Sequence, residues 1–346
     1  MIAKVFRYAL ILGLILCSVL SYSVYQKIFK PNTSFTASSV KVFIPTNTTS
    51  NTLIRILEPF IERREDFVFV AARKKYFSNI KPGRFILQQG LNNNQIINIL
   101  RSKNNPIQVT FNNLDYIEDF AGYMGAKLEC DSLQIIEVFK SKAGSEASQL
   151  NYEQMISMLI PNTYEFYWNT NAEQLWTKMS KEYDSFWTEN RRTKAKKIGL
   201  SRSEVYALAS IVDKESLKPI EQPTIAGVYL NRLRRGIKLQ ADPTVIYAMR
   251  ETLGDRDTII KRVLYKDLTI DSPYNTYRYK GIPPGPIGMP DVSAIDAVLN
   301  AEEHNYFYFV ADIENPGFHD FSKTLREHNR KSRKYTNWLN RNRIYR

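Results

Sequence analysis

The chain has 346 residues, of which 43% are hydrophobic and 12% aromatic, and its formal net charge is +13. Enough apolar material for a substantial core excludes an intrinsically disordered or low-complexity protein. The charge lies at the two ends: residues 1–30 carry +4 and residues 321–346 carry +8, which leaves +1 for the body between them. A nearly neutral body argues against a nucleic-acid-binding protein. The basic ends are better explained by an anionic membrane surface or a solvated tail.

Residues 8–26 form an uncharged, apolar run close to the start of the chain. As a helix, a run of this length spans about 28 Å, close to the roughly 30 Å hydrocarbon core of a bilayer. We therefore expect an uncleaved transmembrane anchor within residues 1–30. A cleaved signal peptide is the alternative, although residues 18–23 offer no clear cleavage site. Basic residues flank the run on both sides, so charge alone does not decide its orientation.

The cysteines and histidines limit the possible disulfide and metal chemistry. Cys17 lies in the apolar run and Cys130 lies outside it, so the fold has to form without an intrachain disulfide. His304, His319 and His328 do not have the spacing of metal ligands. We expect no metal and no cofactor.

After a polar linker over residues 31–39, residues 40–108 predict a small α+β subdomain. Its apolar residues alternate in two short runs and recur at helical spacing in two others. Pro59 lies inside the first helical run and would kink or shorten that helix. The expected elements are strands at 40–44 and 83–87 and helices at 52–62 and 93–100.

Residues 109–346 predict a larger mixed α+β domain, in which residues 109–158 form a connecting lobe. An amphipathic helix over residues 171–190 carries an aromatic stripe, which is more typical of core packing than of a sugar platform. The basic run at 191–197 predicts a solvated turn. Further helices are expected at 133–140, 291–300 and 323–340, and further strands at 306–310 and 318–321.

The most informative segment begins at Ser201, which has Glu204 three residues later, the spacing of a capping box. Glu215 falls on the same helical face as the apolar residues that follow this cap. A carboxyl group in apolar surroundings has a raised pKa and can give up a proton near neutral pH. The alternative is a solvated Glu at the end of a surface helix, because one Glu on an apolar stripe is a weak signal. The apolar residues are Val205, Leu208 and Val212.

A second helix is predicted from Thr224 to the C-cap residue Gly236, after a break marked by Pro219 and Pro223. Residues 239–247 follow, with the sequence Leu-Gln-Ala-Asp-Pro-Thr-Val-Ile-Tyr. We expect the Gln-Ala-Asp-Pro part to form a fixed loop that presents polar side chains. A carboxyl group beside such a loop is what cleavage of a glycosidic bond requires.

Here the chain resembles the endolytic murein transglycosylases, the YceG-like or MltG-type family. The similar blocks occur in the family's order over most of the chain. Two positions depart from the pattern, because Asp213 stands where the family more usually has Glu and Asn162 where it often has Asp. The blocks are residues 159–166, 209–215, 225–233, 239–247, 272–277, 281–288, 306–312 and 328–329.

The resemblance implies a lyase anchored in the inner membrane, with a cytoplasmic N-terminus and a catalytic domain outside that membrane. It implies that residues 40–108 are LysM-like and either contact glycan or act as a spacer. The implied partners are peptidoglycan glycan strands, the membrane and peptidoglycan synthases. Glu215 would be the catalytic residue. The substrate-binding residues would be Gln240, Asp242 and Asn275, with Glu221 and Tyr277 as weaker candidates.

Several of these roles have structural alternatives. Asn275 would hold the N-acetyl group or a water molecule, or would serve only as a turn residue. Asp242 could simply cap a turn before Pro243. Asn231 and Arg232 would brace the loop rather than touch substrate.

The implied reaction starts from protonated Glu215, which would give its proton to the oxygen between N-acetylmuramic acid and N-acetylglucosamine. The resulting carboxylate would then deprotonate the muramic C6 hydroxyl, which closes a 1,6-anhydro ring and ends elongation of a nascent strand. A hydrolytic muramidase is one alternative and would need a water-activating carboxylate such as Asp242. A non-catalytic scaffold that binds peptidoglycan is another. The sequence does not support contact between the basic C-terminal segment and anionic wall polymers.

Overall fold

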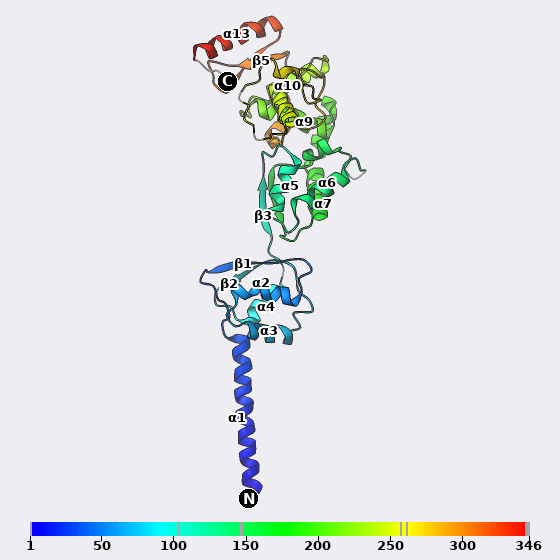
Figure 1. Cartoon of the computed structure of the whole chain (residues 1–346). Helices are drawn as coiled ribbons and strands as arrows, with labels where there is room; N and C mark the ends of the chain where they lie inside the picture. Colours follow the sequence, from blue (N-terminus) through cyan, green and yellow to red (C-terminus); the bar gives the residue numbers. More distant parts are fainter. Residues whose placement is uncertain (1, 103, 146–147, 257, 261, 343–346) are drawn as a thin grey trace. The chain divides into compact units, whose positions relative to one another are not determined.

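The structure is a computed structural model that describes residues 2–102, 104–145, 148–256, 258–260 and 262–342 (Figure 1). Helices dominate, and the strands form three two-stranded sheets within the described residues. The predicted α+β class is confirmed. The chain divides into two compact units, whereas the predicted domain boundaries at residues 39 and 108 stay predictions. The first unit is Met1–Val109, Lys127–Cys130 and Tyr164–Asn171, and the second is Thr110–Ala126, Asp131–Thr163 and Ala172–Arg346.

The first unit begins with helix α1 (Ile2–Phe29), which is 28 residues long. Its stretch Lys4–Phe29 has a mean hydropathy of 1.9 and is long and apolar enough to cross a membrane. No residue of its most apolar 18-residue window is buried, and only the end of the helix, at Ile28, packs against the core of the first unit. Length and composition of this kind fit a membrane anchor, and a signal sequence has the same properties.

The core of the first unit lies between one sheet and three helices. Strands β1 (Ser39–Ile44) and β2 (Gly83–Gln88) pair in antiparallel fashion, and their inward residues include Val42 opposite Phe85. Both strands lie where the sequence predicts them. Pro59 has the expected effect, because the first helix ends at Leu57 and a 3-10 turn, Glu58–Phe60, follows it. The helices are α2 (Ser50–Leu57), α3 (Arg64–Arg73) and α4 (Asn93–Arg101).

The second sheet pairs β3 (Ile107–Phe111) with β4 (Asn162–Phe166). The second unit then contains several helices that pack around buried aromatic side chains such as Phe120, Phe139 and Trp187. The helices are α5 (Ile117–Gly125), α6 (Ser132–Lys142), the 3-10 helix Tyr152–Met158, α7 (Ala172–Phe186) and α8 (Glu189–Ile198).

The prediction of a solvated turn at residues 191–197 was wrong, because this segment belongs to α8. Thr188 caps the helix by accepting a hydrogen bond from the Arg191 backbone N–H, and Gly199 ends it with a positive φ of 76°. Lysine, arginine and alanine are good helix formers, so the composition of the run favours a helix as well. Arg191 anchors it through two 3.0 Å hydrogen bonds to Asp296.

The centre of the second unit is α9 (Arg202–Glu215), in which every side chain from Val205 to Val212 is buried. The predicted capping box is confirmed, since Ser201 and Glu204 each bond the other's backbone N–H. Helix α9 packs against four other α-helices and against the 3-10 helix Tyr152–Met158, and beyond them β5 and β6 pair in antiparallel fashion beneath a C-terminal helix (Figure 1). The elements are α10 (Gln222–Arg234), α11 (Asp242–Leu253), the 3-10 turn Asp267–Thr269, α12 (Val292–Leu299), β5 (Tyr308–Ala311), β6 (His319–Ser322) and α13 (Leu325–Arg341).

Helix α10 requires glycine at Gly227, where a neighbouring segment comes very close. A Cβ atom at this position would meet the Glu302 carbonyl oxygen and the His304 ring far inside van der Waals distance. We expect Gly227→Ala to lower the free energy of unfolding by about 2 kcal/mol, because the helix and the 302–304 segment would have to separate. Urea denaturation of the full chain in detergent measures this change.

Gly122 provides the matched control, since it lies within helix α5 and nothing would contact an added Cβ atom there. Gly122→Ala should raise stability by about 0.5–1 kcal/mol through helix propensity. Equal effects of the two substitutions would contradict the close approach at Gly227.

Candidate active site

Glu215 is the last residue of α9 and borders an open cleft of about 440 Å³ in the second unit. The buried Tyr229 hydroxyl of α10 donates a 2.7 Å hydrogen bond to Glu215 Oε1. The remaining cleft residues come from α10, the loop before α11 and the start of α11, the segment around Tyr277, β5 and β6, and the start of α13. They are Arg232, Leu239, Gln240, Asp242, Tyr277, Tyr308, Phe309, Val310, Ala311, His319, Leu325, His328 and Asn329.

Burial raises the pKa of Glu215 to about 7, and the negative charge of Asp242 contributes in the same direction. The Tyr229 hydrogen bond and the positive charge of Arg232 act against this rise. Tyr229 itself stays protonated, since burial and the Glu215 charge raise its pKa. A carboxyl group with a pKa near 7 is present in both protonation states at neutral pH, so it can act as an acid and then as a base.

Three of the predicted substrate residues lie in the same cleft as Glu215. Gln240 has a positive φ of 50°, and its backbone N–H donates to the Thr276 carbonyl at 3.1 Å. Asp242 begins α11, and its Oδ1 accepts a 2.6 Å hydrogen bond from the Tyr277 hydroxyl. The loop before α11 and the segment around Thr276 are therefore hydrogen-bonded to each other, and together they present Gln240, Asp242 and Tyr277 to the cleft.

Arg232 fixes this loop from inside the protein, where it is 6% exposed. Its Nε donates to the Phe307 carbonyl at 2.6 Å, and its Nη1 donates to the Leu239 carbonyl at 2.5 Å. The neighbouring Asn231 donates to two further backbone carbonyls, those of residues 304 and 306. Arg232 thus braces the loop at Leu239, whereas Asn231 holds the 304–306 segment.

Asn275 and Glu221 do not line the cleft. Asn275 is fully buried, its Nδ2 donates to the Leu268 and Ile270 carbonyls, and its Oδ1 accepts from the Tyr277 N–H. Of its two possible roles, this geometry favours the turn residue, which places Tyr277.

Glu221 is 6% exposed and connects two parts of the site instead of facing the cleft. Its Oε1 accepts a 2.6 Å hydrogen bond from the His319 N–H, and its Oε2 lies 2.8 Å from His319 Nδ1. The same Oε2 accepts from the Ser216 hydroxyl at 3.2 Å. Because Ser216 follows Glu215, Glu221 holds β6 against the end of α9.

Asp213, two residues before Glu215, lies outside the residues that line the cleft. Burial raises its pKa and the charge of Asp291 adds to the rise, while a hydrogen bond from Gln222 opposes it. Lys214, between the two carboxyl groups, pairs with Asp115 at 2.8 Å. Glu215 is therefore the carboxyl group of this segment that a substrate in the cleft would meet.

Comparison with known proteins identifies the family of this chain. The model of the YceG-like family matches residues 42–334, which is most of the chain. The chain belongs to the YceG-like family. A crystal structure of a yceG-like protein from Listeria monocytogenes has a TM-score of 0.55 and 27% identity, and the match covers 85% of this chain and 98% of that one. The predicted family resemblance is confirmed.

Two similar bacterial proteins have the name endolytic murein transglycosylase. The Bacillus subtilis protein is 39% identical over 178 residues, which is 51% of this chain and 47% of that protein. A Streptococcus pneumoniae protein is 36% identical over 155 residues, which is 45% of this chain and 28% of that protein. The chain thus aligns with less than half the length of these relatives.

The sequence did not identify Tyr229, Tyr308 or His328 as parts of this YceG-like site. Tyr229 lies on an apolar stripe of α10, where a tyrosine is expected to pack in the core. The ring of His328 stacks on that of Tyr308 with centroids 5.3 Å apart, and burial lowers the pKa of His328. All three residues lie in family blocks, at 225–233, 306–312 and 328–329, but a block gives no role to the residues in it.

Metal chemistry has no visible support in the part of the chain that the structure describes. There, no group of three or more His, Cys, Asp or Glu side chains is placed to hold a metal ion. Neither Cys17 nor Cys130 forms a disulfide bond within the described residues.

Proposed function

We propose that this chain is a membrane-anchored endolytic lytic transglycosylase that cuts nascent peptidoglycan strands between N-acetylmuramic acid and N-acetylglucosamine. One observation carries the proposal: Glu215 lies in a cleft, bonded to Tyr229, with its pKa raised to about 7. The names of the similar proteins support murein as the substrate. The cut would leave 1,6-anhydromuramic ends and terminate strand elongation.

The proposed reaction uses the two oxygens of Glu215 differently. Tyr229 donates to Oε1, so Oε2 carries the proton that passes to the glycosidic oxygen as its bond to muramic C1 breaks. The carboxylate then takes the proton of the muramic C6 hydroxyl while that oxygen bonds to C1. Glu215 accepts one proton after giving one, so the enzyme is regenerated without water. Polar groups of the cleft, among them Gln240, Asp242 and Tyr277, would hydrogen-bond the sugars in the oxocarbenium-like state.

The anchor and its orientation belong to the same proposal. Helix α1 would cross the inner membrane with its N-terminus in the cytoplasm, which puts the second unit on the side where strands are made. Residues 40–108 would contact glycan as a LysM-like unit or act as a spacer. Peptidoglycan synthases are the proposed protein partners, because nascent strands emerge from them.

A hydrolytic muramidase is the second candidate, because Asp242 lines the same cleft as Glu215. Mass spectrometry of the products from nascent strands and the full chain in detergent separates the possibilities. Ends with 1,6-anhydromuramic acid are expected. Reducing ends would instead establish a hydrolase with a second carboxylate, and binding without cleavage would leave only a scaffold.

Tyr229→Phe should shift the pH dependence of cleavage. The hydrogen bond to Glu215 lowers the pKa of that carboxyl group, so its removal raises this pKa further. Protonated Glu215 then persists to higher pH, and the alkaline limb of the kcat/KM profile moves to higher pH. We expect kcat to fall about three- to tenfold as well, since the carboxyl group loses its orientation. Initial rates between pH 5 and pH 9 measure both effects.

Tyr206→Phe is the control for this substitution. Tyr206 is also buried, but its hydroxyl donates to the Leu159 carbonyl at 2.7 Å, away from Glu215. The pH profile of this variant should match that of the wild type. A Tyr229→Phe profile that is merely scaled down, with no shift, would mean that Tyr229 has only a structural role.

A further inference from the structure

Helix α13 has two chemically different faces, and one of them forms a wall of the cleft. Leu325, His328 and Asn329 line the cleft. Lys331 anchors the helix to β6, because its Nζ donates to the Phe321 carbonyl at 2.7 Å. The position of the helix beside the cleft is therefore fixed by contacts within the second unit.

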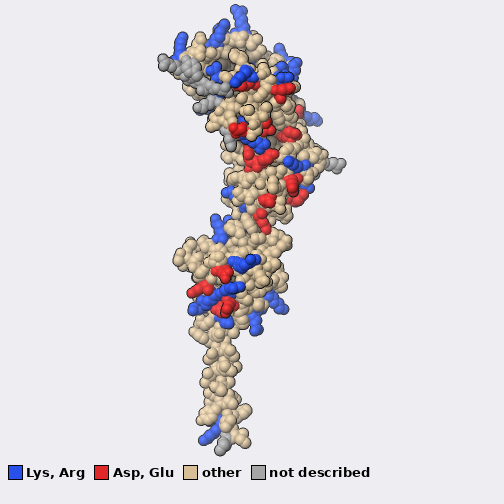
Figure 2. All heavy atoms as spheres, viewed as in Figure 1, with Lys and Arg blue, Asp and Glu red and all other residues tan. Residues whose placement is uncertain are grey.

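The other face carries Arg326, Arg330 and Arg333, which we call the arginine stripe. Their spacing of four and three residues places them on one side of a helix. All three are exposed, and no acidic side chain of the described chain lies within ion-pair distance of them. Lys and Arg side chains project from this part of the surface in Figure 2.

The stripe also borders the cleft. Arg326 lies three residues before the cleft residue Asn329 and Arg333 four residues after it, so both are neighbours of Asn329 on the helix surface. A strand that passes over the cleft wall would therefore meet these three guanidinium groups next.

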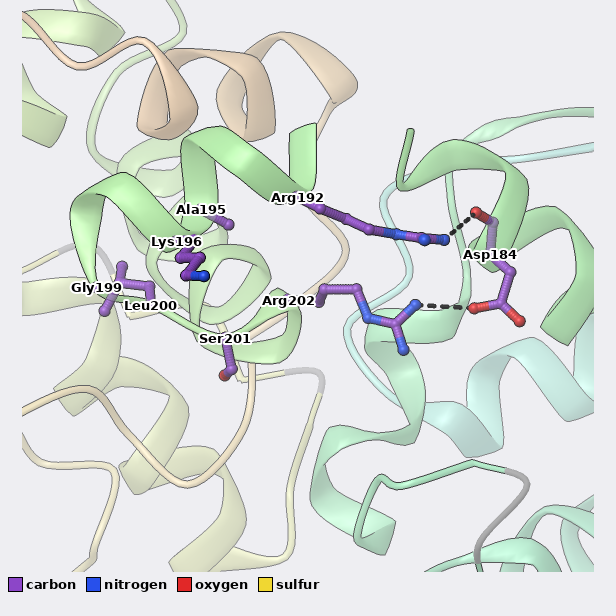
Figure 3. Close-up of a pocket in the computed structure, with 8 residues that line it drawn as sticks. All are labelled: Asp184, Arg192, Ala195, Lys196, Gly199, Leu200, Ser201 and Arg202. Atoms are coloured by element: carbon purple, nitrogen blue, oxygen red, sulfur yellow. Dashed lines mark hydrogen bonds and ion pairs between the residues drawn. The ribbon is translucent and has the colours of Figure 1, made fainter. Parts of the chain in front are cut away.

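A second concavity with basic side chains lies among α7, α8 and the start of α9 (Figure 3). It is larger, about 760 Å³, and part of its positive charge is neutralised within the protein. The Asp184 carboxylate pairs with Arg202 at 2.8 Å, and the Asp184 carbonyl accepts from Arg192 at 3.3 Å. In the arginine stripe, by contrast, no acidic side chain of the described residues is placed to neutralise any of the three charges, and the stripe belongs to the helix that lines the Glu215 cleft.

We propose that the arginine stripe binds the carboxylates of the stem peptides on the glycan strand and holds the strand across the cleft. This inference rests on the proposed function. When the lactyl group is amide-linked to a peptide, the sugars are neutral and the negative charge lies on the stem. The stem projects from the muramic residue, the same sugar whose bond would be cut. Guanidinium groups match carboxylates in charge and geometry, which suits them to this contact.

The test compares strands with free stem carboxylates and the same strands after these carboxylates are converted to amides. The triple variant Arg326→Gln, Arg330→Gln, Arg333→Gln should raise KM about tenfold on the anionic strands, as expected for three exposed ion pairs. On amidated strands the KM of the triple variant should equal that of the wild type. Cleavage of these strands also shows that the variant is folded. The control variant Arg192→Gln, Lys196→Gln, Lys197→Gln loses the same number of positive charges. Its KM should equal that of the wild type on both the anionic and the amidated strands.

Equal KM values for the triple variant and the wild type on anionic strands would overturn the proposal. A defect that persists on amidated strands, or that occurs only in nanodiscs with anionic lipid, would also overturn it, the latter in favour of a lipid contact. If the wild type cuts neither preparation, the proposed function fails on its own. Co-sedimentation of the full chain carrying Glu215→Gln, with and without the triple substitution, then still decides whether the stripe binds stem carboxylates.

Discussion

Glu215→Gln is expected to reduce cleavage of nascent strands by about 10²- to 10⁴-fold while strand binding is retained. The amide has the shape of the carboxyl group and still offers Oε1 to the Tyr229 hydroxyl, but it cannot give up or take a proton. The magnitude is that of losing a group that transfers protons in the transition state. Quantified anhydromuramic ends measure the rate, and co-sedimentation with strands measures binding.

The control for this experiment lies on the same helix. Asp213→Asn removes a carboxyl group that does not line the cleft, so most of the activity should persist. If Asp213→Asn abolished activity while Glu215→Gln remained active, the catalytic acid would be Asp213 and not Glu215. Loss in both variants would require a test of whether Asp213 positions α9.

Glu215→Gln should also change the free energy of unfolding in a pH-dependent way. The folded-state pKa of Glu215, about 7, lies above the ordinary glutamate value of 4.5, so the native state binds a proton more tightly than the unfolded state. Stability from this group is full below pH 4.5 and is lost as the pH rises through 7. Glu215→Gln removes that loss and should be more stable than the wild type at pH 8 by roughly 1–3 kcal/mol, with little difference at pH 4.5. Urea denaturation at the two pH values measures this.

Features fixed by local sequence could be predicted well. The capping box at Ser201 and Glu204 and the shortening at Pro59 depend on residues within one turn of each other. The same reasoning failed at residues 191–197, where the charge suggested a turn although the capping residues Thr188 and Gly199 favour a helix. Capping residues and helix propensity therefore predict the helices of this chain better than the density of charged residues does.

The site could be predicted only in part, because its chemistry depends on contacts between distant elements. Helical spacing placed Glu215 on an apolar face, but its hydrogen bond comes from Tyr229 on the next helix. The family resemblance singled out Asn275 and Glu221 without showing that their polar atoms are engaged inside the protein. A sequence block marks a residue as part of the site, whereas only packing shows whether it faces the substrate.

Arg232→Met should destabilise the second unit by about 3 kcal/mol and lower kcat/KM at least tenfold. Methionine fills similar space but leaves the Leu239 and Phe307 carbonyls without the donors they have now. The loop that carries Gln240 and the segment that leads into β5 would both lose their shared anchor. Urea denaturation and initial rates on nascent strands measure the two effects.

Arg234→Met, two residues later on the same helix, is the matched control because Arg234 is exposed. It should change the free energy of unfolding by less than about 0.5 kcal/mol. Arg232→Met carries a second signature, since the Arg232 charge lowers the pKa of Glu215 and its removal should move the alkaline limb of kcat/KM to higher pH. A destabilised variant with an unshifted limb would mean that Arg232 acts on the loop alone. A variant as stable and active as Arg234→Met would show that the loop is held by other contacts.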